Sequence, residues 1–389
     1  MRAAVIGAGV ILSTALWLAA LSVGAPFDAA NGALDRAFGG LPAWTQVRNM
    51  YRNPETQEAS AGEKPLASFH RLAGYWAHGG RVLFIGNSQM QMVSLARGEA
   101  PPTGPEKTWV DLVTDELAKS GSDLKAYRLS AGGMTYAEAL WDILYLTAHP
   151  ELKPQAIFLQ MNYQFLWSNG IRDGMLELLD DPAFRDAAAR EAARGDGYSG
   201  LFRERLQAGA ARGATAGAAP STEANAPAER LESEVRQGLS GWIGFRERGR
   251  QRDDFLNLLY RARIYFLHLK PSTARSISEV RLRESQTAVE RIAEICREEN
   301  IRFVLLRVPA NPLISLYRTP EDHDRYMRYL ADMASRFATP VYDFEDLVPA
   351  QEWGLAYNGP DPLHMGRAGH RLLASRVIPI VELEMAAKP

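Results

Sequence analysis

The sequence predicts an α/β fold: a doubly wound parallel sheet with helices on both faces, in three layers. Short apolar runs rich in β-formers alternate with segments that have the 3.6-residue period of amphipathic helices. The run at 155–161 is interpreted as apolar throughout, as expected for a strand covered on both sides. The 389 residues suffice for one large domain or two modest ones.

The first 27 residues are interpreted as the targeting segment. Only Arg2 is charged before Asp28, and the apolar run is long enough to cross a bilayer, for which roughly 20 residues suffice. The length favours an uncleaved transmembrane anchor over a signal peptide cleaved at the small residues 23–25. Because the positive-inside rule keeps the N-terminus in the cytoplasm, we expect a single-pass inner-membrane protein with its main domain on the periplasmic side.

The elements up to the third strand follow in a regular order. A connector spans 28–80, and its last part, 66–76, is expected to be helical. The expected strands lie at 82–85, 124–129 and 155–161, and the expected helices lie at 90–96, 108–120 and 136–146, with a loop at 98–105. Ser88, Gly133 and Asn162 each follow one of these strands, at the edge where open α/β sheets bind ligands.

The sheet pattern stops over 165–271, which we interpret as an insert dividing one domain into 81–164 and 272–389. Its centre, 187–228, is rich in Ala, Gly and Arg and is predicted to be disordered, whereas 173–179 and 253–269 are predicted to be helical. The insert is either a lid or docking cap beside the cleft, or a tolerated surface insertion.

The expected order after the insert is a helix at 276–300, a strand at 301–308, a loop at 309–312, a helix at 320–337 and a strand at 341–344. A loop then carries Asp361 and His364, and a helix at 366–383 closes the chain.

Ser88, Asp361 and His364 form a joint pattern. A serine between a strand and a helix presents its hydroxyl near the positive end of the helix, although such a serine alone is more often a cap. An Asp three residues before a His can orient the ring and leave the other nitrogen free to take a proton from a serine. The pattern predicts Ser88 as the nucleophile, His364 as its base and Asp361 as the orienting carboxylate.

Four short blocks between Arg81 and Leu373 resemble the SGNH (GDSL-like) hydrolase superfamily, and within it the membrane-anchored acyl-transfer proteins related to DltD and to alginate O-acetylation. The blocks are Gly86-Asn87-Ser88-Gln89, with Asn where the family has Asp; Ser130 to Thr135; Met161 to Gln164, which lacks the usual flanking Gly and Asp; and Asp361 to His364. The resemblance implies a flavodoxin-like sheet and an oxyanion hole formed by the N–H groups of Ser88 and Gly133 and the amide of Asn162.

Composition excludes several other classes of protein. A net charge of −2 and 46% hydrophobic residues do not fit a disordered or nucleic-acid-coating protein. The single cysteine, Cys296, rules out an internal disulfide and a cysteine zinc cluster, and it is expected to be a small core residue. No spacing typical of metal ligands appears, and no cofactor is expected. The α/β-hydrolase elbow has a glycine two residues before and two residues after its serine, and Met90 stands at the second of these positions, so this motif is excluded.

Three functions remain open. The first is a serine O-acyltransferase or O-acylesterase that acts on an exported polysaccharide or envelope glycan, and the resemblance implies a multi-pass membrane acyltransferase as its partner. The second is a secreted esterase or lipase. The third is an inactive interaction module that keeps the fold. His370, six residues after His364, is expected to serve packing and not catalysis.

Overall fold

The computed structural model describes residues 65–76, 79–94, 96, 99, 106–163, 166, 170–216, 277–317, 319–356 and 359–387. Except for Ala216, they belong to one compact unit, Asn49–Thr215 with Pro271–Pro389; the other unit is Met1–Arg48 with Ala216–Lys270. The expected anchor at 1–27, the connector up to 64 and the expected helix at 253–269 lie outside the described residues. Within the described residues, no helix has the length and apolar character needed to span a membrane.

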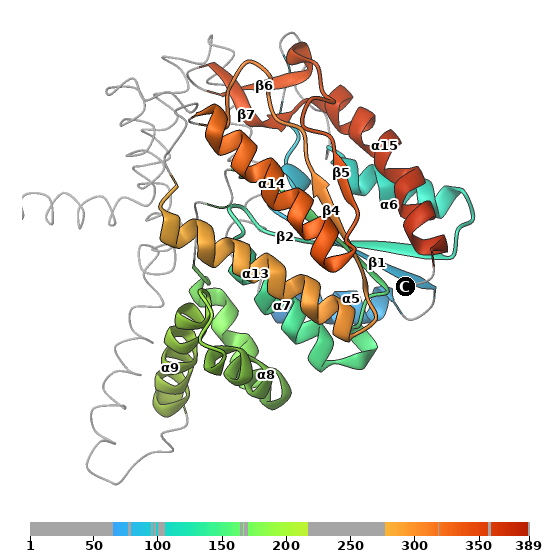
Figure 1. Ribbon diagram of the computed structural model, residues 1–389. Coiled ribbons are helices and arrows are strands. Elements are labelled where there is room, and N and C mark those ends of the chain that lie inside the picture. The colour runs from blue at the N-terminus through green and yellow to red at the C-terminus, as the bar shows by residue number, and fades with distance from the viewer. Residues whose placement is uncertain are drawn as a thin grey trace, which may run out of the picture. The chain divides into compact units, whose positions relative to one another are not determined.

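Five parallel strands form the sheet, in the order β2-β1-β3-β4-β5 (Figure 1). They are β1 (Gly80–Gly86), β2 (Leu124–Ser130), β3 (Ala156–Met161), β4 (Arg302–Arg307) and β5 (Val341–Asp343). This arrangement confirms the predicted doubly wound parallel sheet. The strand order reverses between β1 and β3, which is the switch point where open α/β sheets bind ligands.

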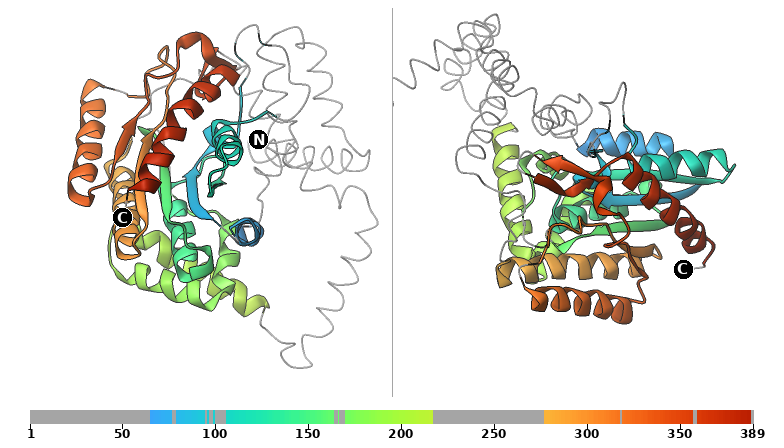
Figure 2. Two further views of the ribbon diagram at one scale, coloured as in Figure 1. Left: turned by 90° about the vertical axis from the view of Figure 1, so that its right-hand side faces the viewer. Right: turned by 90° about the horizontal axis from the view of Figure 1, so that it is seen from above.

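Helices cover both faces of the sheet (Figure 2). One face packs against α5 (Pro65–Tyr75), α7 (Tyr136–Ala148), α13 (Glu279–Glu298) and α14 (Pro320–Phe337), and the other against α6 (Trp109–Lys119) and α15 (Arg367–Ala386). Successive side chains of a strand point to opposite faces, so Leu83 and Ile85 enter the first core, and Val82 and Phe84 the second. The apolar strand β1 is therefore buried on both sides.

Capping residues mark the helix starts near the site. Thr135 accepts the Glu138 N–H at 3.1 Å, and the Glu138 carboxylate accepts the Thr135 N–H, which is a capping box. Thr319 caps α14 ahead of Pro320, which suits the first helical turn. These caps fix where the connections after β2 and β4 enter their helices.

Three predicted elements differ from the structure. The expected helix at 90–96 is wrong, because a 3-10 turn, η1 (Ser88–Met90), is followed by irregular chain. Disorder over 187–228 is wrong for 187–216, where α8 (Pro182–Ala193) ends and α9 (Ser199–Ala216) follows; 217–228 lies outside the described residues. The expected loop around Asp361 is strand β7 (Gly359–Met365), paired antiparallel with β6 (Trp353–Ala356).

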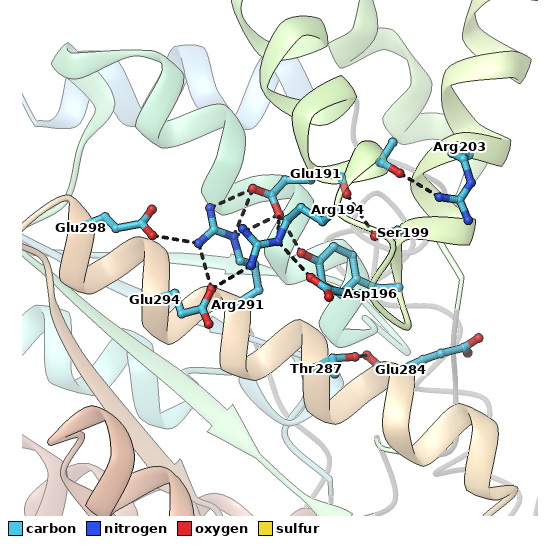
Figure 3. A network of polar contacts seen from close by, with 12 residues as sticks. Glu191, Arg194, Asp196, Ser199, Arg203, Glu284, Thr287, Arg291, Glu294 and Glu298 are labelled. Carbon is cyan, nitrogen blue, oxygen red and sulfur yellow. Dashed lines mark hydrogen bonds and ion pairs between the residues drawn. The ribbon is translucent and has the colours of Figure 1, made fainter.

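Helix α8 is anchored to α13 by a buried ion-pair network (Figure 3). The Arg291 guanidinium donates to both oxygens of Glu191, at 2.8 Å from Nη2 and 3.0 Å from Nε, and also to Glu294 and Glu298. Tyr198 donates its hydroxyl to Glu191 at 2.6 Å. The described part of the insert is thereby fixed to the sheet-covering helices. Its predicted role as a lid or docking cap stays a prediction.

Candidate active site

Ser88 is the first residue of η1, directly beyond the carboxyl end of β1. Gly86 ends the strand, and a Cβ at that position would come within 2.2 Å of the Gln160 side chain, so only glycine fits there. Asn87 is extended, and its side-chain oxygen accepts the Gln89 N–H at 3.1 Å. This short turn presents the hydroxyl of Ser88 at the switch point of the sheet.

His364 and Asp361 reach Ser88 from the far end of the chain. The Ser88 hydroxyl and His364 Nε2 lie 2.9 Å apart, and His364 Nδ1 lies 3.0 Å from Asp361 Oδ2. Asp361 also accepts the backbone N–H groups of Leu363 and His364, each at 2.9 Å. The structure thus brings together the three residues that the sequence singles out, in the order serine, imidazole, carboxylate.

Electrostatics in the buried pair favour the ionised carboxylate and a basic imidazole. Burial alone would raise the pKa of Asp361, but the charge of His364 and three hydrogen bonds lower it below 3.8. Burial alone would lower the pKa of His364, but the Asp361 charge and hydrogen bond raise it above 6.5. Asp361 therefore increases the capacity of His364 to take a proton from Ser88.

Gly133 and Asn162 lie just beyond the carboxyl ends of the two strands that flank β1. Ile85 is aligned with Leu159 of β3, and Gly86 with Ser130 of β2. Ser88 and Asn162 each lie three residues after their members of the aligned pair Ile85 and Leu159. Gly133 lies three residues after Ser130, which is aligned with Gly86. Gly133 has φ +67°, which favours glycine, whereas Asn162 is buried. Their donation to an oxyanion stays a prediction.

A buried amide cluster that was not predicted from the sequence supports the turn that carries Ser88. Gln160 of β3 accepts the Asn87 N–H at 3.2 Å and donates to the side-chain oxygens of Asn87 and Gln89. All three side chains are at most 2% exposed. Gln160 is the one polar residue inside β3, so the signal was present in the sequence. The cluster fixes the backbone on both sides of Ser88.

The loop after β4 connects the two halves of the site. Gln89 donates its amide to the carbonyl of Pro309 at 2.9 Å, and Asn311 donates its amide to the carbonyl of Asp361 at 2.8 Å. The short loop at 309–312 thus contacts Gln89, the neighbour of Ser88, through Pro309 and contacts Asp361 through Asn311. The sequence places 309–312 at the rim of the sheet but gives no sign of these partners.

His370 has a structural role, as predicted. It is fully buried; Nδ1 accepts the Trp109 N–H at 3.0 Å, and Nε2 lies 3.1 Å from the Met92 carbonyl, to which it donates. Burial lowers the pKa of His370 to about 4, which keeps the ring neutral. Both ring nitrogens are occupied, so His370 joins α15 to α6 and is not available as the base.

Among the described residues, no group of three or more His, Cys, Asp or Glu side chains is arranged to hold a metal ion. Cys296 is buried in α13, as predicted, and burial raises the pKa of its thiol.

No protein-family model matches the sequence, and no curated protein matches it either. Among solved structures, the chain is similar to the psychrotrophic esterase EstA from Pseudoalteromonas sp., at 10% identity over 79% of this chain and 100% of that one, with a TM-score of 0.36. It is also similar to the acetylxylan esterase Axe2 from Geobacillus stearothermophilus, at 12% identity over 78% and 94%, with a TM-score of 0.36.

Proposed function

We propose that this protein is a serine-dependent O-acylesterase or O-acyltransferase that acts on an exported polysaccharide or cell-envelope glycan. The observation that supports the proposal best is the chain of contacts from the Ser88 hydroxyl to His364 at 2.9 Å and on to Asp361 at 3.0 Å. This arrangement is the one that activates a serine for acyl transfer.

The reaction follows from the geometry. As Ser88 Oγ attacks the ester carbonyl, its proton moves to His364 Nε2, and the carbonyl electrons move onto oxygen. Asp361 accepts the Nδ1 proton in a hydrogen bond and stabilises the imidazolium without taking that proton. The imidazolium then protonates the leaving alcohol as the C–O bond breaks, which leaves an acyl-serine.

Donors for the tetrahedral oxyanion are assigned to the N–H groups of Ser88 and Gly133 and to the amide of Asn162. One such donor contributes about 3–4 kcal/mol in the transition state. Water resolves the acyl-serine in an esterase, and a sugar hydroxyl resolves it in a transferase. In both reactions His364 removes the proton of the attacking oxygen.

The glycan substrate, the membrane location and the partner are part of the proposal and rest on the sequence. An anchor in 1–27 would hold the catalytic domain at the periplasmic side of the inner membrane, where exported glycans emerge. A multi-pass membrane acyltransferase would deliver the acyl group there.

Labelling with a fluorophosphonate probe tests the nucleophile. We expect wild-type protein to be labelled at Ser88, and we expect Ser88→Ala to abolish labelling, because the probe reacts with an activated serine. Ser375→Ala, an exposed serine on α15, is the matched control and should label normally. Folded wild-type protein that never reacts would refute the catalytic proposal and favour an inactive module.

A further inference from the structure

A cavity of about 570 Å³ lies along the edge strand β2 and reaches Gln91, three residues after Ser88. At one end it is lined by Gln91, Ser130, Ala131 and Met134, which follow η1 and β2. The Ala131 N–H donates to the Gly86 carbonyl at 3.3 Å, and Gln91 donates to the Ser130 carbonyl at 2.8 Å. The cavity therefore reaches the segments that directly follow η1 and β2, and these segments are hydrogen-bonded to each other and to the end of β1. Its volume suits a ligand of several sugar rings or of drug size.

The cavity continues along β2, the edge strand of the sheet, to the helices on either side. Side chains from α5, α6, α7 and η4 (Asp173–Asp180) complete its walls. Tyr75 is among them; it is 40% exposed and lies against Tyr127, with ring centroids 5.8 Å apart. Exposed aromatic rings next to polar groups are suited to the apolar faces and hydroxyl edges of sugar rings.

Asp142 of α7 lines this cavity and is only 6% exposed. No donor among the described residues forms a hydrogen bond with its carboxyl group. Burial, with the nearby Glu138 charge, raises the pKa of Asp142 well above 3.8, and Arg172 opposes this shift. A carboxyl that is so little exposed, has no donor from the described protein and lines a ligand-sized cavity is placed to hydrogen-bond a group bound there.

Four other charged groups of the cavity wall, Arg172, Arg128, Asp111 and Asp115, are compensated within the protein. Arg172 binds the Glu138 carboxylate through Nε at 2.6 Å and Nη2 at 2.9 Å. Arg128 pairs with Asp111 at 3.2 Å, and Asp115 pairs with Lys107. This balance favours an uncharged, hydroxyl-rich ligand over a phosphate or an ammonium group.

We propose that this cavity is the glycan subsite of the enzyme, in which Asp142 hydrogen-bonds a hydroxyl of a neutral sugar chain that extends away from Ser88. The proposal rests on the proposed function, and it adds a recognition residue outside the triad. A protonated carboxyl both donates and accepts, as a sugar hydroxyl does, so the two groups are complementary.

Binding to an inactive protein separates the subsite from catalysis. Ser88→Ala protein is mixed with neutral hexasaccharides of glucose, xylose, mannose and N-acetylglucosamine, and binding is measured by saturation-transfer NMR. At least one should bind. Adding Asp142→Leu should weaken that affinity about tenfold, because the sugar hydroxyl loses its partner. Adding Asp142→Asn should retain it within about threefold, because the amide also donates and accepts.

Two readouts on protein that retains Ser88 exclude a merely structural role. Asp142→Leu should leave p-nitrophenyl acetate hydrolysis within about twofold of wild type, because that small ester does not need the subsite. It should also keep or raise the melting temperature, because a carboxyl retained for binding destabilises the empty protein. Asp332→Leu, on the exposed surface of α14, is the control.

The outcomes are distinct. If none of the four hexasaccharides binds, or if Asp142→Leu binds as well as its parent, the subsite proposal is overturned. A drop in melting temperature in Asp142→Leu also overturns it, since Asp142 would then be structural. Fluorophosphonate labelling without sugar binding would overturn the subsite and leave the proposed catalytic function intact. Sugar binding without labelling would overturn the catalytic function and leave the sugar site intact.

Discussion

Replacing Asp361 by Asn tests the electrostatic core of the proposed mechanism. The asparagine oxygen can keep the two 2.9 Å hydrogen bonds from the Leu363 and His364 N–H groups. Its amide nitrogen then faces Nδ1 and donates to it, so the neutral ring carries its proton on Nε2 and presents no acceptor to Ser88. A serine triad with this change loses about 10⁴-fold in kcat, or about 5 kcal/mol of transition-state stabilisation. We expect a loss of that order here.

The same substitution should shift the pH profile. His364 acts as a base only when neutral, so activity falls as pH drops through its pKa, which Asp361 raises above 6.5. Without the carboxylate, burial is the main remaining influence and lowers the pKa of the ring. The acid limb of kcat/KM in Asp361→Asn should therefore lie at lower pH than in wild type.

Stability changes in a defined pH window. The raised pKa of His364 contributes stability that is complete below 6.5 and lost as pH rises through the folded-state pKa. The lowered pKa of Asp361 contributes stability that is present above 3.8 and lost as pH falls through its folded-state pKa. Asp361→Asn should therefore lose most stability between 3.8 and the raised pKa of His364.

Initial rates of p-nitrophenyl acetate hydrolysis from acid to mildly alkaline pH measure the loss of kcat and the shift of the acid limb. Thermal melts across the same buffers measure the loss of stability. Asp332→Asn on the surface of α14 is the control for losing a carboxylate. An Asp361→Asn protein with a near wild-type rate and an unmoved acid limb would refute the assignment of Asp361 as the partner of His364.

Three further predictions concern groups around the site. Gln160→Leu should lower stability by about 2 kcal/mol or more, because it leaves the Asn87 N–H and the Gln89 oxygen buried without partners, and should lower kcat; Gln155→Leu, just before the same strand, should cost less, because it gives up only an exposed bond from the Arg81 N–H, and should leave kcat unchanged. Arg291→Ala should cost about 3 kcal/mol in denaturant melts, because the buried Glu191 loses its closer cation and keeps only Arg194, at 3.6 Å; a cost like that of a surface pair would contradict this. Asp142→Asn should stabilise the protein more at neutral pH than below 3.8, because an acid with a raised folded-state pKa loses stability as pH rises; equal melting shifts at both would contradict the raised pKa.

The sheet and the three triad residues were predictable from the sequence because their signals are local. A strand such as β1, apolar on both faces, is distinctive, and all parallel strands carry their carboxyl ends to one edge. A serine after the first strand and a histidine near the last helix are therefore expected at the same edge, although 276 positions separate them. The chain order is enough to place such residues.

Elements that depend on distant partners were harder to predict. Strand β7 contains Pro360, Pro362 and Asp361, residue types depleted in strands, and it forms because β6 pairs with it. The Ala-rich stretch before 217 suggested disorder, yet Ala is the strongest helix former, and helices form there because Phe184 and Phe202 pack at 5.0 and 4.9 Å against Trp141. Tertiary packing decided both segments.

Gln160 shows how a functional signal is lost when a strand is described only by its average character. A buried polar side chain needs partners, and a glutamine in a strand beside the nucleophile can supply both a donor and an acceptor. It bonds Asn87 and Gln89 on either side of Ser88, and Gln89 in turn bonds the Pro309 carbonyl. From there the loop reaches Asp361 through Asn311. The distance between nucleophile and base therefore depends on a continuous set of buried amides as well as on the sheet, and a change in any of them should affect kcat before it affects binding of a small ester.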